Sequence, residues 1–249
     1  MTELGSLTPT LTAVGLLMVL TAAVLMVFRV PHAFAPALAI LRGAAQLAAV
    51  SLVLGAVIAS AEWVAVALGV MFTVAAVTAA RRLGWSWRRL AVVAGSMAAG
   101  VLAALVIVFA TGAIEFTSRY ALAIGGIIVG NSMSIAGLAG RRFNEAVIDR
   151  WDQVEGWLAL GATARQATRE MARNAVYSAL IPTVDQTKTT GLVTLPGAFV
   201  GAIFGGLSPL EAGRFQIVVL ASIMAAGSVT AILLISLLAP VRVRPAPLA

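Results

Sequence analysis

Long uninterrupted runs of apolar residues constrain this chain more than any other feature of its sequence. Several of them, such as residues 7–28 and 90–110, provide about the 20 residues that a helix needs to cross a hydrocarbon core about 30 Å thick. The chain is 61% hydrophobic and only 11% charged, whereas soluble domains carry about 25% charged residues. Too few polar side chains remain to cover a water-exposed surface. The sequence therefore predicts a multi-pass protein of the cell (inner or plasma) membrane.

These runs predict an all-α, polytopic transmembrane helical bundle, because a helix satisfies its own backbone hydrogen bonds in lipid. The alternating pattern of a barrel strand is not visible. About seven spans are expected within a single transmembrane domain of residues 1–249. They cover residues 7–28, 36–59, 63–80, 90–110, 120–139, 184–204 and 215–239. The first is expected to be a permanent span rather than a signal peptide, because no basic region precedes it and no small-residue cleavage site follows it.

The basic residues indicate how the bundle is oriented. Loop 81–89 carries four arginines, and thirteen of the seventeen basic residues fall on its side of the membrane, which the positive-inside rule makes the cytoplasmic side. Four acidic residues fall on the other side, namely Glu3, Glu62, Glu115 and Glu211. We therefore expect the N-terminus outside and the C-terminus inside. On this interpretation the net charge of +7 reflects topology, and no nucleic-acid partner is expected.

The largest segment outside the predicted spans is the cytoplasmic segment 141–174. Four of its apolar residues recur at spacings of four, three and four, which predicts a helix with one apolar stripe. They are Val147, Trp151, Val154 and Leu158. Gly161 is expected to end this helix, and Thr163 with Gln166 forms a capping-box pattern that opens a second one. We predict a helix-turn-helix whose stripe faces either a partner protein or the bilayer surface.

Polar side chains inside spans are costly and mark candidate positions on a substrate path. The candidates are Asp185, Lys188, Thr187, Asn131, Met133, Gln46 and Arg42. Each has a structural alternative. Asp185 and Lys188 could form a local pair near the interface, Arg42 could reach toward the headgroups, and Asn131 could form an interhelical hydrogen bond.

The predicted sixth span is the most unusual part of the chain. Residues 181–197 contain two prolines, two glycines and five threonines. A continuous helix over residues 174–206 would be about 50 Å long, which exceeds the hydrocarbon core. We expect it either to begin in the cytosol or to break near Pro182 or Pro196, where freed backbone groups must face protein or a water-filled cavity.

Glycines spaced by four predict close helix packing within the bundle. They are Gly126 and Gly130 in the fifth span, and Gly197, Gly201 and Gly205 in the sixth. The chain has no cysteine and a single histidine, His32, which argues against disulfides and against zinc or haem centres of the usual kind.

Three stretches resemble the FetB-type ABC transporter permeases, a bacterial family assigned to iron export whose plant relatives are linked to aluminium tolerance. The stretches are residues 42–47, 130–133 and 158–197, and the resemblance extends over essentially the whole chain from Arg42 onward. Residues 155–163 also resemble the cytoplasmic coupling loop of ABC permeases, although Gly156 and Trp157 stand where that loop has two alanines.

The resemblance implies a half-transporter, in which a homodimer of this permease works with two copies of a separate ATPase subunit that binds ATP and Mg²⁺. It places Glu155, Trp157, Gly161 and Thr163 in the coupling to that ATPase, and it implies a metal ion, with iron suspected, as the exported substrate. No G-x-x-x-x-G-K-[ST] motif occurs in the sequence, so the chain is expected to be no enzyme and to bind no cofactor itself. Two alternatives stay open: a proton-coupled secondary transporter of a small polar solute acting through Asp185, and a scaffold or receptor that transports nothing.

Overall fold

The computed structural model describes residues 2–248 and, among them, the side chains of residues 8–55 and 57–248. These residues form ten helices, with one isolated bridge between Thr190 and Thr194 and no longer strand among them. The predicted all-α class is confirmed. Internal contacts divide the chain into two compact units, Met1–Ala59 and Ser60–Ala249.

The first unit is a helical hairpin. Helix α1 (Thr2–Val27) is joined to α2 (Ala35–Ile58) by a short turn in which Arg29 and His32 adopt positive φ angles of 55° and 60°. Almost every described side chain on the two helices is exposed or only partly buried within this unit. Glu3, which the charge pattern places outside the cell, lies beyond the described side chains.

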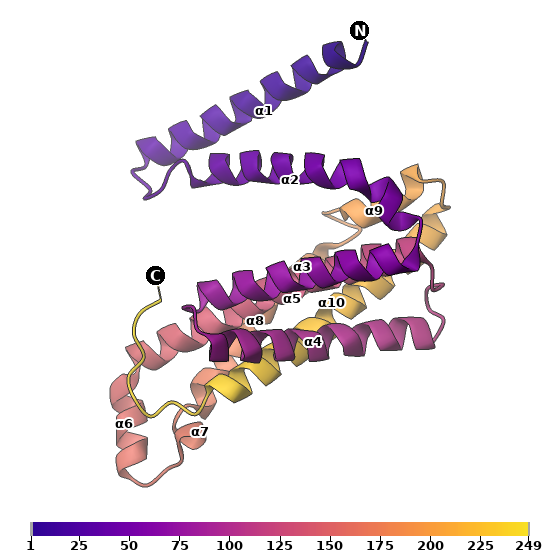
Figure 1. Ribbon diagram of the computed structural model, residues 1–249. Coiled ribbons are helices and arrows are strands. Elements are labelled where there is room, and N and C mark those ends of the chain that lie inside the picture. Colours follow the sequence, from indigo (N-terminus) through magenta and orange to yellow (C-terminus); the bar gives the residue numbers. More distant parts are fainter. Residues whose placement is uncertain (1, 249) are drawn as a thin grey trace. The chain divides into compact units, whose positions relative to one another are not determined.

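The second unit is built around four long helices (Figure 1). They are α3 (Ala61–Arg82), α4 (Trp87–Ala110), α5 (Ser118–Asp149) and α10 (Pro209–Leu238). Helix α10 packs against α4 and α5, and α5 also packs against α3. Side chains such as Met97, Ile124, Ile128 and Leu234 are fully buried between them. These four helices form the core to which the remaining helices of the unit attach.

Short polar caps explain where these helices begin. Ser60, Ser86 and Thr117 each accept a hydrogen bond from a backbone N–H three residues later, at 3.3, 3.1 and 3.3 Å. Helix α10 begins with a capping box between Ser208 and Glu211. Such caps satisfy N–H groups that have no partner within the helix. The loops between spans can therefore be short.

Within residues 2–248, six helices are long and apolar enough to cross a membrane. They are the segments Thr8–Val27, Ala35–Gly55, Ala61–Arg82, Trp87–Ala110, Ser118–Asp149 and Pro209–Leu238. The sixth predicted span, residues 184–204, is not one helix. Helix α8 (Arg169–Thr189) ends inside it, and the short helix α9 (Gly197–Phe204) begins directly after Pro196. The break predicted near Pro196 is confirmed, whereas Pro182 lies within α8.

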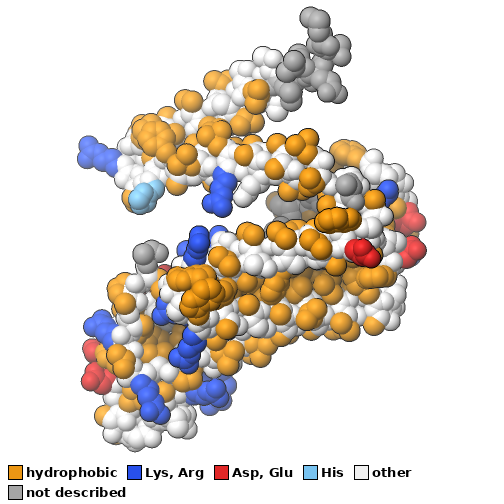
Figure 2. All heavy atoms as spheres, in the orientation of Figure 1, with side chains coloured by type: hydrophobic (Ala, Val, Ile, Leu, Met, Phe, Trp, Pro, Cys, Tyr) orange, Lys and Arg blue, Asp and Glu red, His pale blue; other side chains and the backbone are white. Residues whose placement is uncertain are grey.

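Charged side chains are unevenly distributed between the two ends of the second unit (Figure 2). Most arginines lie at the end that holds the α3–α4 loop, the last turns of α5 and the C-terminal tail. Glu62, Glu115 and Glu211 lie at the other end, near the first residues of α3, α5 and α10. The asymmetry used to predict the orientation is therefore present in the folded unit, and the orientation itself stays a prediction.

Candidate functional site

The first part of the candidate site is an elbow formed by α6 (Trp151–Ala159), a glycine turn and α7 (Ala164–Ala167). Helix α5 runs unbroken into it as far as Asp149, and the chain bends at Arg150, where φ is −115° and ψ is 33°. The predicted stripe helix is therefore two helices rather than one. Gly161 has a φ of 87°, a conformation that suits glycine at the end of a helix. The capping box between Thr163 and Gln166 is confirmed.

The predicted apolar stripe of the elbow is buried within this chain. Val147 and Val154 are fully buried in an apolar cluster that also includes Ala167 of α7, Met171 of α8 and Ile235 of α10. Trp151 and Leu158 are partly buried against the same cluster. The expectation that the whole stripe faces a partner or the bilayer is wrong, because Val147 and Val154 are buried within this chain, where α6 packs against α5 and α7.

A different set of side chains remains exposed on the elbow, and we call it the elbow tip: Glu155, Trp157 and Leu160. Trp157 is 51% exposed and Leu160 is 82% exposed. Glu155 is exposed and forms no ion pair with any described residue. Sequence reasoning found Glu155 and Trp157 but missed Leu160, although its spacing of three from Trp157 places both on one side of the helix end.

Two contacts fasten the elbow to the spanning helices. The buried hydroxyl of Thr168, between α7 and α8, lies 2.7 Å from the carbonyl oxygen of Ala239, at the end of α10, and 3.0 Å from that of Ala164. Arg150 forms an ion pair with Glu170 of α8 at 3.2 Å. These contacts join the elbow to the start of α8 and the end of α10.

The second part of the candidate site is the polar end of α8. Asp185 and Lys188 form the predicted local pair, with Oδ1 and Nζ 3.3 Å apart, and their side chains are 61% and 69% exposed. The Thr187 hydroxyl donates to the carbonyl oxygen of Thr183 at 2.8 Å. Beyond Thr189 the chain turns through Gly191, whose φ is 88°, and its N–H donates to the Thr194 carbonyl oxygen at 2.8 Å.

Asn131 lies at a depth in the second unit similar to that of Asp185. The side chains of Ile135 on α5 and Leu180 on α8 both lie next to Gly227 of α10. Ile135 and Leu180 are therefore at a similar position along the bundle. Asn131 is four residues before Ile135 and Asp185 is five after Leu180. Helices α5 and α8 run in opposite directions, so moving back along α5 and forward along α8 leads to the same side of Gly227. Asn131 and Asp185 therefore both lie roughly 6–8 Å from the level of Gly227, on that side. The Asn131 amide donates to the Ile127 carbonyl oxygen at 2.8 Å, within its own helix rather than between helices.

The other predicted residues are spread more widely. Arg42 and Gln46 are exposed on one face of α2, in the first unit, and Met133 is partly buried in the second. A Cβ added at Gly130, Gly197 or Gly201 would meet no neighbouring atom within 4 Å. At Gly126 it would meet only the flexible end of Met71, and at Gly205 only backbone atoms of its own segment. A packing role for these glycines stays a prediction.

Close helix packing occurs instead at isolated glycines that carried no sequence signal. A Cβ at Gly100 on α4 would collide with the Ala226 carbonyl oxygen, and one at Gly227 with Ile135. Sequence reasoning also missed four buried polar atoms without a hydrogen-bond partner among the described residues, which belong to Ser96, Ser132, Gln216 and Thr230. Single serines, threonines and glycines in apolar runs give no pattern by which to choose among them.

Comparison with known proteins identifies relatives over most of the chain. It is 41% identical to "UPF0014 membrane protein STAR2" of Oryza sativa subsp. japonica over 70% of its length. It is 38% identical to "Protein ALUMINUM SENSITIVE 3" of Arabidopsis thaliana over 68% of its length. It is also 38% identical to "Probable iron export permease protein FetB" of Escherichia coli (strain K12) over 57% of its length. No solved structure matches significantly.

The matched regions cover 61%, 62% and 54% of these three proteins, so the chain spans about three fifths or less of their length. The description "Uncharacterised protein family (UPF0014)" matches residues 8–241. Together with the six apolar helices, this match shows that the chain is a membrane protein and belongs to the UPF0014 family.

Proposed function

We propose that this chain is the membrane-spanning subunit of an ABC transporter, in which two copies of it work with two copies of a separate ATPase. The elbow carries the proposal. Its apolar stripe is already buried in this chain, yet Trp157 and Leu160 remain exposed at its tip. Exposed aromatic and apolar side chains on a rigid support are typical anchors for a protein partner.

The elbow is also placed to pass a partner's motion to the polar stretch. Thr168 and Arg150 tie it to α10 and α8, and α8 leaves it directly at Arg169. Thr189 ends α8 twenty residues later, about 30 Å along the helix axis. Motion at the elbow tip would therefore move Asp185 and the break before α9.

The proposed substrate is a metal ion, and the printed name of the E. coli relative suggests iron export. Asp185 and the nearby threonine oxygens are ligands that suit hard cations. No three His, Asp or Glu side chains come together among the residues that the structure describes. In the proposed dimer, the second copy would supply a further Asp185 to complete the ligand set.

Co-purification with a co-expressed phosphate-loop ATPase subunit from the same organism tests the proposal. Trp157→Ala and Glu155→Ala should lose the ATPase while membrane levels stay unchanged. Trp87→Ala is the control, because Trp87 is even more exposed than Trp157, at 77% against 51%, and lies at the same end of the unit but outside the elbow. ATPase activity of the reconstituted complex, measured across ferric, aluminium and divalent metal ions, should rise with the transported ion.

The second candidate is a proton-coupled transporter, favoured by the exposed carboxylate of Asp185 at the polar end of α8. This candidate predicts that proteoliposomes containing this chain alone take up the solute when a pH gradient is applied. Such uptake would refute the ATPase-driven proposal. If no uptake occurs until the ATPase and ATP are added, the proton-coupled candidate fails.

A further inference from the structure

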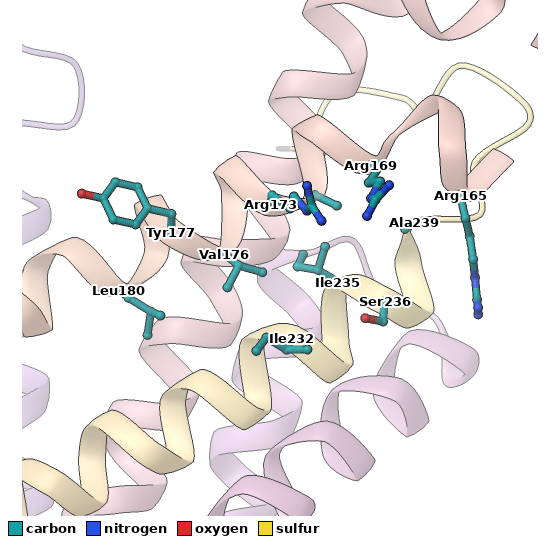
Figure 3. Close-up of a pocket in the computed structure, with 11 residues that line it drawn as sticks. Arg165, Arg169, Arg173, Val176, Tyr177, Leu180, Ile232, Ile235, Ser236 and Ala239 are labelled. Carbon is teal, nitrogen blue, oxygen red and sulfur yellow. The ribbon is translucent and has the colours of Figure 1, made fainter. Parts of the chain in front are cut away.

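A groove of about 540 Å³ lies between α8 and α10, at the end of the second unit that holds the elbow (Figure 3). Val176 and Leu180 line it from α8, and Ile232 and Ile235 line it from α10. Its volume falls within the range of about 300–1,000 Å³ that is usual for small-molecule sites. The groove is therefore large enough for an extended apolar chain.

Three arginines lie along one edge of this groove, Arg165 on α7 and Arg169 and Arg173 on α8 (Figure 3). All three are exposed, and none forms an ion pair with a described residue. No acidic residue lines the groove, and the nearby Glu170 is paired with Arg150. The edge thus carries three positive charges without a counter-ion from the described part of the chain.

We propose that this groove binds an anionic phospholipid, with the phosphate at the three arginines and an acyl chain between α8 and α10. Guanidinium groups donate paired hydrogen bonds to phosphate oxygens. Basic pockets between transmembrane helices are a known way to recognise anionic headgroups. The charged edge lies beside the elbow, at the end that the arginine distribution places at the membrane surface, while Leu180 and Ile232 lie deeper along the spanning helices.

Charge complementarity favours a lipid over a second copy of this chain seated in the groove. A symmetric contact would bring the same patch of both copies together, and six arginines would then meet with no carboxylate among the lining residues. A small soluble anion would satisfy the arginines but leave the apolar walls uncovered. A lipid satisfies both parts of the groove at once.

Native mass spectrometry and thermal unfolding of the purified full chain in a neutral detergent test the proposal. Phosphatidylglycerol should remain bound and raise the unfolding temperature, whereas phosphatidylcholine and inorganic phosphate should do neither. The variant R165Q/R169Q/R173Q should bind phosphatidylglycerol roughly 100-fold more weakly. The control R88Q/R141Q/R242Q removes three exposed arginines that do not line the groove, and it should bind as the unmodified chain does.

A second variant tests the apolar part of the site. Ile232 is partly exposed, so Ile232→Trp fills the groove without disturbing the core and leaves all three arginines in place. It should release phosphatidylglycerol as well. The proposal is overturned if Ile232→Trp binds the lipid normally, if phosphatidylcholine or phosphate binds equally well, or if the control triple variant loses as much. It is also overturned if the arginine variant separates copies of the chain without changing lipid binding.

Discussion

At the residue scale, α4 and α10 approach each other closely at Gly100 of α4, where a Cβ would collide with the Ala226 carbonyl oxygen and the Thr230 hydroxyl of α10. Backbone atoms cannot move aside as a flexible side chain can. Gly100→Ala should therefore lower the free energy of unfolding by about 1–3 kcal/mol, measured as a lower unfolding temperature in detergent. Gly95→Ala on the same helix is the control, because nothing lies within 4 Å of its Cβ, and it should be neutral or slightly stabilising.

A substitution in the ion pair of Asp185 and Lys188 distinguishes an effect on stability from an effect on transport. Both side chains are largely exposed, and exposed ion pairs contribute at most about 1 kcal/mol. Asp185→Asn should therefore leave the unfolding temperature nearly unchanged but lower ATPase-driven transport at least tenfold, measured in proteoliposomes. Glu145→Gln breaks the similarly spaced and similarly exposed pair with Arg142 and should leave transport intact. Normal transport by Asp185→Asn would remove this residue from the substrate path.

Sequence reasoning at this scale identified polar residues in unusual places but could not assign their partners. It offered a local pair of Asp185 and Lys188 as the alternative to a place on the substrate path, and the structure shows this pair, whereas the place on the path stays a prediction. It could not foresee that the Asn131 amide bonds within its own helix, since both partners of that bond belong to one apolar run. It also found none of the groove arginines as a group, although their spacing of four was available as a signal.

At the element scale, the elbow is held to α10 by the buried Thr168 hydroxyl and the Ala239 carbonyl oxygen. Thr168→Val keeps the size of the side chain but removes this hydrogen bond, which lowers the free energy of unfolding by about 0.5–1.5 kcal/mol, because the Ala239 carbonyl oxygen still accepts from the Val241 N–H. We expect faster hydrogen exchange in residues 151–168 than in the unmodified chain. Thr78→Val is the control, because the Thr78 hydroxyl bonds only to its own helix, at Val74. Equal exchange in both variants would show that Thr168 does not fasten the elbow.

Local sequence rules predicted element boundaries well where a single turn decides them. The capping box at Thr163, the end of α6 near Gly161 and the break before α9 all follow from caps, glycine and proline. The sequence also identified the apolar stripe of the elbow, but it did not identify the residues that bury this stripe. Val154 is fully buried on α6, which packs against α5 and α7, whereas a periodic stripe indicates only that some other element must cover it.

At the scale of the whole molecule, the predicted topology places Leu160 in the cytoplasm and Phe116 outside. Both are exposed, one on the elbow and one in the loop between α4 and α5 at the other end of the second unit. The chain has no cysteine, so Leu160→Cys and Phe116→Cys each introduce a single label site. A membrane-impermeant maleimide should label Phe116→Cys in intact cells and Leu160→Cys only after the cells are opened. The reverse pattern would place the elbow outside and refute the ATPase proposal.

The sequence by itself determined that this chain is a helical bundle in a membrane. Hydropathy over 20 residues and the placement of arginines can both be read along the chain without knowledge of which residues are in contact. The sequence also located the elbow and the broken helix, since caps and helix breakers act within a few residues. Only the tertiary structure decided which elbow side chains remain exposed, which glycines bring helices together, and that three arginines edge an apolar groove. Those features depend on which helices become neighbours, and many apolar faces of equal hydropathy could have packed together.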